Sequence, residues 1–445
     1  MNQKFFIGLL VWVHALSLTG AEAWAGKAKP KIEIVASQGE FPLPANAEKV
    51  WQLSDLIQEA LGKNPELYAY KERWKAAKAR VWKAWSWENT MIGADFEGIP
   101  RGRGDADRAN NIEWMISQKI PFPGKRFLQA RVASKEAKMV KEDYLAKERE
   151  IVSEIKKAYF EYFLREHEVR LHEETKRILE RLSKSAESSY ATGQVSYDEL
   201  LGAHIELAMI TNEVAKHYQQ RDTALARLNL LLGQDATEPL QIATAVPTRD
   251  FSYTREDLMK LVLQNRPELR AVRYGFEAAK TDVKSAWWDL MPDGQVRLEA
   301  RQFPGEGRIR EYDQFFGFEV PVFSLLGRVG QIKEKQAESH AAQGAWENMK
   351  NLVLFEVQEA WAEFESNHRT VKVYESTIVP QAESVVDAAL AEYESGKGNF
   401  LKAMEAQKRL TEFRHHYFEA IAMREQSFAE LERVVGIDLS GGIPQ

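Results

Sequence analysis

The sequence predicts a mainly α-helical fold in which long helical hairpins are duplicated, each preceded by a pair of short strands. Three observations lead to this fold class. The 445 residues contain an internal repeat, residues 125–192 contain neither glycine nor proline, and short alternating segments precede the long stretches in both halves. Helices of globular proteins average about 11–12 residues, so an uninterrupted helix of this length indicates a coiled-coil-like rod.

The internal repeat is most visible at Asn64–Leu67, read as Asn-Pro-Glu-Leu, and at Arg266–Leu269, read as Arg-Pro-Glu-Leu. Further matches follow in the same order, with offsets that drift only between 200 and 203 residues. So many collinear matches indicate a duplicated structural unit. They include Ala76–Lys78 with Ala278–Lys280, Pro121 with Pro321, Tyr190–Gly193 with Tyr393–Gly396, and Gly233 with Gly436.

The repeat divides the chain into two halves joined by a proline-containing linker. We expect a signal peptide at 1–25, an extended segment at 26–50, a first repeat at 51–240, a linker at 241–253, a second repeat at 254–440 and a tail at 441–445.

The first residues are typical of a secretory signal peptide. Lys4 supplies the positive start, Phe5–Leu18 is an apolar run, and Ala23-Trp24-Ala25 fits a cleavage site with small residues. The apolar run is shorter than the roughly 20 residues of a membrane-spanning helix. We therefore expect export with cleavage of this segment, and any membrane crossing by the mature chain to use strands.

Composition excludes several classes of function. The net charge is −6, which argues against general nucleic-acid binding because that needs a basic surface. The chain contains no cysteine, which excludes disulfides, thiolate metal sites and thiol catalysis.

Each repeat is expected to begin with a short helix, capped by Ser54 in the first half and by Thr254 in the second. Two strand-like stretches follow in each half. In the first half, Ile112, Trp114 and Ile116 alternate with polar residues. This alternation and a length of about 9–11 residues suit tilted transmembrane strands. We expect strands at 91–99, 112–120, 295–303 and 312–320.

The long helices are predicted to pack side by side. Along 200–232, a series of residues is spaced alternately by four and three, which keeps one seam facing a partner helix. Pro380 lies inside the second long helical stretch and predicts a kink or a break there. The predicted seam consists of Leu200, His204, Leu207, Thr211, Val214, Tyr218, Arg221, Leu225, Leu228 and Leu232.

No arrangement of residues indicates catalysis, a metal site or a cofactor. His167 and His172 are five residues apart, so on a helix they point in different directions, and a solvated face is expected. His415 and His416 are adjacent and are also expected to point to different faces. We therefore expect a protein that is not an enzyme and that needs no cofactor.

The duplicated order of helix, strand pair and two long helices, with Asn64–Leu67 and the Tyr-x-x-Gly segments at 190–193 and 393–396, resembles the TolC family of outer-membrane efflux channels. The resemblance covers nearly all of the mature chain. It implies a homotrimer in which four strands from each protomer close a 12-stranded barrel in the outer membrane. The long helices then form a periplasmic tunnel. Three chains together pair the sheet edges that the four strands of one chain would leave open.

Within this family, Gln118–Arg126 and the chain length resemble the channels of heavy-metal efflux systems, which are CzcC- and CusC-like. The resemblance implies a passive exit duct, with heavy-metal cations as the expected cargo, working with a periplasmic adaptor protein and an inner-membrane pump of the resistance-nodulation-division type. Drug efflux and type I protein secretion are alternatives within the family. A non-conducting periplasmic coiled-coil protein is the alternative from another class.

The family implies a gate at the periplasmic tips, where the long helices turn after Gly193 and Gly396. The residues at gate positions of the two tips are Asp198, Glu199, Tyr393, Lys402 and Glu405. This chain departs from the family pattern, because Lys402 stands where an aspartate ring is expected and Gly398 where a gate arginine is expected. Our hypothesis is that Glu199 and Lys402, which are equivalent positions with opposite charge, face each other around the closed gate.

Overall fold

The structure is a computed structural model, and it describes residues 50–99, 109–193, 195–244, 253–303, 308–320, 322–394 and 400–439. Residues Met1–Lys49 form a separate unit, and the description concerns the unit that begins at Val50. The expected signal peptide, nearly all of the expected extended segment, the tail at 441–445 and Gly398 lie outside the described residues.

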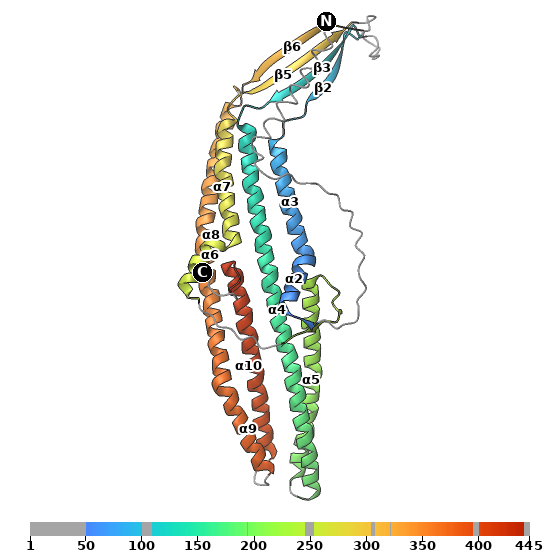
Figure 1. Ribbon diagram of the computed structural model, residues 1–445, viewed down its shortest axis with the longest axis vertical. Helices are drawn as coiled ribbons and strands as arrows, with labels where there is room; N and C mark the ends of the chain where they lie inside the picture. Colours follow the sequence, from blue (N-terminus) through green and yellow to red (C-terminus); the bar gives the residue numbers. More distant parts are fainter. Residues whose placement is uncertain are drawn as a thin grey trace. The chain divides into compact units, whose positions relative to one another are not determined.

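The first repeat contains helices, strands and a long hairpin in the expected order (Figure 1). Its elements are β1 (Val50–Trp51), α2 (Leu53–Lys63), α3 (Pro65–Trp85), β2 (Met91–Glu97), β3 (Asn111–Ile120), α4 (Lys125–Ala191), α5 (Tyr197–Leu232) and β4 (Gln241–Ile242).

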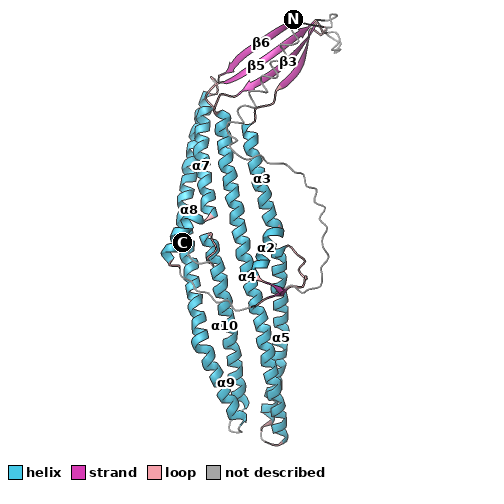
Figure 2. Cartoon of the chain, in the orientation of Figure 1, coloured by secondary structure: helices cyan, strands magenta, loops and turns pink. Residues whose placement is uncertain are grey.

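The second repeat has the same order of two helices, two strands and a long helical hairpin, which Figure 2 colours by type. In the described residues it has no counterparts of β1 and β4, and η2 divides its first long helix. Its elements are α6 (Arg255–Asn265), α7 (Pro267–Trp288), β5 (Asp293–Gln302), β6 (Ile309–Glu319), α8 (Leu325–Val373), η2 (Tyr374–Ile378), α9 (Val379–Glu394) and α10 (Phe400–Val435). The mainly helical, duplicated fold class is confirmed.

Local sequence explains where the shorter helices begin. Asn64 caps α3 by accepting hydrogen bonds from the backbone N–H groups of Glu66 and Leu67, and Pro65 follows in the first helical position. Thr254 caps α6 as expected, with its hydroxyl accepting from the Asp257 N–H. The expectation for Ser54 was wrong, because α2 already begins at Leu53 and Gln52 occupies the cap position.

Helix α4 is continuous over 67 residues, or about 100 Å at about 1.5 Å per residue. Gly124, immediately before it, has a φ of 100°, and an added Cβ would lie 2.9 Å from the Trp288 ring. Glycine is therefore required there for both conformation and space. At the other end, Gly193 turns the chain with a φ of 73°.

The second long helical stretch is interrupted by a π-helical turn, η2. The Val379 N–H donates to the Tyr374 carbonyl, five residues earlier, and Pro380 follows directly. Proline has no N–H to donate and its ring crowds the preceding turn, so the wider π-turn accommodates it. The predicted break is absent, because the backbone stays helical through Pro380, and the winding changes to a π-turn directly before it.

The four longer strands form one antiparallel sheet in the order β2-β3-β5-β6. The central pair joins the two repeats, with Glu113 opposite Arg301 and Ser117 opposite Arg297. Strands β2 and β6 are the edges, and each has only one neighbour in the described residues.

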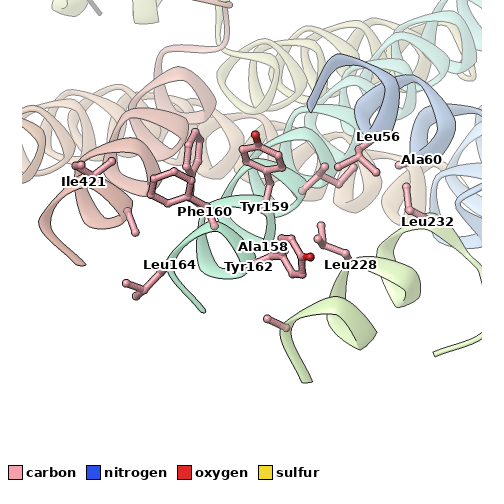
Figure 3. Close-up of a cluster of buried hydrophobic side chains, with 14 of the residues drawn as sticks. Leu56, Ala60, Ala158, Tyr159, Phe160, Tyr162, Leu164, Leu228, Leu232 and Ile421 are labelled. Atoms are coloured by element: carbon pink, nitrogen blue, oxygen red, sulfur yellow. The ribbon is translucent and has the colours of Figure 1, made fainter. Parts of the chain in front are cut away.

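Two equivalent apolar cores hold the helices of the two repeats. In the first, side chains of α2, α4, α5 and α10 meet around Leu56, Phe160 and Leu228 (Figure 3). In the second, Leu258, Phe364 and Leu431 belong to α6, α8 and α10. In each core, the short opening helix of the repeat packs against the long helices.

The seam of α5 has the expected spacing but a different phase near the tip. Val214, Leu228 and Leu232 are buried as predicted, whereas His204 and Thr211 are exposed. Ala203 and Ile210, one residue earlier in each case, are buried instead. The predicted seam was therefore wrong at His204 and Thr211, whereas Leu200 and Leu207 pack against the core near the tip as predicted.

Candidate functional site

The sheet has one polar face and one apolar face. Residues directly opposite each other on antiparallel strands share a face, so the register places Glu113, Ser117, Arg297 and Arg301 together. The other face carries the alternate residues of every strand. These include Ile92, Phe96, Ile112, Trp114, Ile116, Val296, Leu298, Phe316 and Phe318.

Charges on the polar face are paired around Arg301. Its guanidinium lies 3.1 Å from Glu311 and 3.5 Å from both Glu113 and Asp313. Lys119 and Glu319 form a second pair at 3.2 Å. This face can therefore line a water-filled space, since its charges meet partners from neighbouring strands.

The apolar face is exposed in the single chain. Ile92 is 75% exposed, Phe316 70% and Phe318 77%. Soluble proteins rarely expose contiguous apolar surface of this kind, which marks a contact with lipid or protein. In the described residues, no helix has the length and hydropathy needed to span a membrane.

The first helix tip presents acidic groups. Asp198 and Glu199 lie in the first turn of α5, where the helix dipole favours negative charge. A hydrogen bond with Ser196 lowers the pKa of the exposed Asp198 carboxyl. The rings of Tyr190 and Tyr197 lie 5.8 Å apart across this turn.

The second tip presents a positive charge that is paired within its own hairpin. Lys402 Nζ lies 2.7 Å from Glu392 Oε2, so α9 and α10 are joined there. The Tyr393 hydroxyl donates to Ser185 Oγ of α4 at 3.5 Å, which links the two hairpins. Glu405 is exposed on α10. Within one chain, Lys402 therefore has a partner other than Glu199.

Sequence analysis did not identify the polar contacts that join the two hairpins above the tips. Lys408 lies 3.8 Å from Glu206 of α5, and Arg414 lies 3.7 Å from Glu174 of α4. The hydroxyls of Thr175 and Thr411 are 2.9 Å apart and buried. These contacts combine residues about 200 positions apart, and no local pattern signals such pairs.

A second group that sequence analysis missed surrounds Glu168 of α4, which is 1% exposed. Arg165 donates to both of its oxygens at 3.0 Å, and His217 of α5 lies 3.2 Å away. His415 of α10 lies 3.3 Å away. Together these residues line part of a cavity of 520 Å³ between the three helices.

The expectation that His172 lies on a solvated face was wrong. Its ring is buried, and its centroid lies 4.2 Å from that of the His217 ring, with the two planes tilted by 36°. Burial, the largest effect, lowers the pKa of His172. Burial alone would raise the pKa of Glu168, but hydrogen bonds from His217 and Arg165 and the charge of Arg165 outweigh it and lower that pKa.

Comparisons with known proteins agree with this architecture. The sequence matches the family described as outer membrane efflux protein over residues 56–234 and 258–437. It is 21% identical to the cobalt-zinc-cadmium resistance protein CzcC of Cupriavidus metallidurans, over 71% of this chain and 75% of that protein.

Solved structures show the same fold. CusC aligns with a TM-score of 0.74 and 18% identity, covering 93% of this chain and 100% of that chain. The outer membrane protein VceC of Vibrio cholerae aligns with a TM-score of 0.72 and 18% identity, covering 86% of this chain and 96% of that chain. Since the family match spans both repeats and most of the sequence, the chain belongs to the outer membrane efflux protein family.

Proposed function

We propose that this chain is the outer-membrane channel of a tripartite efflux system, and that three copies form one continuous duct. The observation that carries the proposal is the amphipathic sheet with two unpaired edges, β2 and β6. A lipid-facing sheet must close, because hydrocarbon offers no partner for the N–H and C=O groups of an open edge. Three copies of the four-stranded sheet make a 12-stranded barrel, with apolar residues outside and paired charges inside.

The long helices continue the duct on the periplasmic side. An expected signal peptide at 1–25 would be cleaved on export. The helix tips would dock a periplasmic adaptor protein, which connects the duct to an inner-membrane pump of the resistance-nodulation-division type. Energy and selectivity would come from that pump, because a passive duct must bind its cargo weakly enough to release it.

The gate of this duct would lie at the helix tips. We assign it to Asp198, Glu199, Tyr393, Lys402 and Glu405. The acidic first tip and the basic Lys402 are of opposite charge, and in a trimer three copies of each approach one axis. Supporting observations are the position of Asp198 and Glu199 in the first turn of α5 and of Lys402 in the first turn of α10.

The proposed cargo is heavy-metal cations. The support is the similarity to CzcC, whose name assigns it to cobalt, zinc and cadmium resistance. Channels for organic drugs or for secreted proteins share this fold and are the alternative cargo classes. A non-conducting periplasmic rod is disfavoured, because such a protein has no use for a sheet with an exposed apolar face.

Growth of a gene deletion strain tests this function. The strain and its complemented parent are compared on divalent metals, on monovalent copper and silver, and on organic toxicants. We expect selective sensitivity to divalent metals, rescued by the gene. Sensitivity to organic toxicants alone would show that the cargo is organic and not metallic, and it would still support the proposal of an efflux duct. Rescue by a variant that lacks the strand segments 91–120 and 293–319 would contradict the duct itself.

A further inference from the structure

Helix α10 carries two histidines between two glutamates, in the order Glu412, His415, His416 and Glu419. One ligand atom each from His415, His416 and Glu419 lie within 4.8 Å of one another. His416 Nδ1 is 3.1 Å from Glu419 Oε2, and His416 Nε2 is 4.0 Å from Glu412 Oε1. The spacing along the sequence explains why these side chains lie close together, because residues three and four apart share one face of a helix.

A buried carboxylate lies beside one of the two imidazoles. His415 Nδ1 is shielded from solvent and lies 3.3 Å from Glu168 Oε1, although the two atoms are not aligned for a hydrogen bond. Metal-binding histidines commonly face a carboxylate with one ring nitrogen, which leaves the other nitrogen to bind the ion. Glu168 is itself held by Arg165. The structure thus provides both a group of three ligands and a fixed support behind it.

The second imidazole, His415, distinguishes this group from a simple histidine–glutamate pair. A solvated histidine–glutamate pair occurs elsewhere on the hairpins: His204 Nε2 lies 3.0 Å from Glu187 Oε1 and both side chains are about half exposed. Among the described residues, the other group of three possible ligands is Glu113, Glu299 and Asp313, which contains no histidine. Two of its carboxylates already face Arg301.

We propose that His415, His416 and Glu419 form a binding site for a divalent first-row transition-metal ion such as Zn²⁺, Co²⁺, Ni²⁺ or Cu²⁺. Imidazole nitrogen and carboxylate oxygen are the ligands these ions prefer. Mg²⁺ and Ca²⁺ prefer sites made of oxygen ligands, and Cu⁺ prefers sulfur. Three protein ligands leave a fourth coordination position for water. The site belongs to the wall of the protein, so it does not depend on which cargo the duct exports.

Binding of Co²⁺ to the purified full-length protein tests the site. The protein is prepared in detergent without a histidine tag, and bound Co²⁺ is measured by equilibrium dialysis and by its visible absorption. We expect one ion per chain, with this binding lost in His416→Ala and in Glu419→Gln. Both side chains are partly exposed, so the trimer is expected to persist, and its migration in detergent gels verifies this.

Two further variants separate a metal site from nonspecific binding. His204→Ala removes a histidine of similar exposure that pairs with a single glutamate, and it should leave Co²⁺ binding unchanged. Glu168→Gln removes the carboxylate beside His415, and it should weaken binding by about 10–100-fold without abolishing it. Absence of Co²⁺ binding, or equal binding by the wild-type, His416→Ala and Glu419→Gln proteins, would overturn the proposal, whatever the growth assays show.

Discussion

The two hairpins arise from one repeated unit, yet they differ in continuity and in charge. In the first, α4 runs unbroken for 67 residues and the tip is acidic. In the second, the π-turn η2 lies between α8 and α9, directly before Pro380. The tip of this hairpin carries the positive charge of Lys402. The apolar cores at Phe163 and Phe364, by contrast, are equivalent.

This difference shows where the two hairpins depart from the repeated pattern. The first hairpin contains the continuous α4, whereas the second changes its helical winding at η2. A π-turn is a local change in winding that is frequent at functional sites. Contacts such as Lys408–Glu206 and Tyr393–Ser185 join the two hairpins near the tips.

The largest expected effect tests the equivalence of the cores. Phe163 and Phe364 are 0% and 3% exposed, respectively. Replacing either with alanine should cost about 3–5 kcal/mol of stability, because a large apolar side chain is lost and a cavity remains. Denaturant unfolding of the two variants measures this. A cost below about 1 kcal/mol for one alone would show that the two cores are not equivalent.

The next effect tests the difference in continuity. Arg177 of α4 corresponds in the repeat to Pro380, and its exposed side chain makes only a weak contact, with the Glu173 carbonyl at 3.3 Å. Arg177→Pro should therefore destabilise the first hairpin by about 3 kcal/mol, since proline removes a helical hydrogen bond and clashes with the preceding turn.

The reverse change, Pro380→Ala, should raise amide protection at 374–378, because it allows the ordinary helical ladder to form. Hydrogen exchange measures both variants. Arg177→Ala is the matched control and should leave protection unchanged. Unaltered exchange at 374–378 in Pro380→Ala would show that proline is not the cause of the π-turn.

A third effect concerns the buried His172 of the first hairpin and depends on pH. Burial lowers the pKa of His172 below its ordinary value of 6.5. The unfolded chain therefore takes up the proton first, so stability is full above pH 6.5 and falls as the pH drops below it. Despite burial, hydrogen bonds from His217 and Arg165 lower the pKa of Glu168 below 4.5, so the loss continues below that pH.

Thermal stability of the trimer between about pH 7 and pH 4 measures this dependence. His172→Gln should flatten the first part of the curve. His340→Gln changes an exposed histidine of α8 and should leave the curve unchanged. An identical curve for wild-type and His172→Gln would contradict the assigned role of His172.

The smallest expected effect concerns the tips. An exposed ion pair contributes only about 0–1 kcal/mol, although three copies act together at one gate. Lys402→Glu should raise the conductance of the closed channel, because it places negative charge beside Glu392 and opposite an acidic tip. Planar-bilayer recording measures this conductance, with Lys184→Glu, at an exposed lysine of α4, as a control for charge alone.

The double variant Glu199→Lys with Lys402→Glu distinguishes between Glu199 and Glu392 as the partner of Lys402 that matters for conductance. Restored low conductance would show that Glu199 and Lys402 face each other in the trimer. Conductance that stays high would assign the effect to the Glu392 pair within one hairpin. Unchanged conductance in Lys402→Glu alone would exclude Lys402 from the gate.

Much of the fold follows from local sequence. The uninterrupted 125–192 stretch and Thr254 as a cap act over a few residues, and the structure contains the features they predicted. Pro380 is accompanied by a π-turn in place of the expected kink or break. The phase of the α5 seam was misjudged at His204 and Thr211, because several faces of this helix carry apolar residues and packing selects among them.

The candidate sites were harder to predict because they depend on distant pairs. Glu168, His217 and His415 come from three helices, and nothing in the spacing of any one helix brings them together. The adjacent His415 and His416 were expected to diverge, but flexible side chains bring their ligand atoms close to Glu419. The assignment of the gate residues is based on the family resemblance, and their role stays a prediction.

Cross-linking of strand edges tests the central claim, that copies of this chain close into one duct, most directly. The chain contains no cysteine, so single pairs of cysteines can be placed along β2 and β6 and oxidised in intact outer membranes. We predict, for at least one register, a ladder of covalent species that ends at three chains. Only single chains at every register, or a ladder that continues beyond three, would contradict the account.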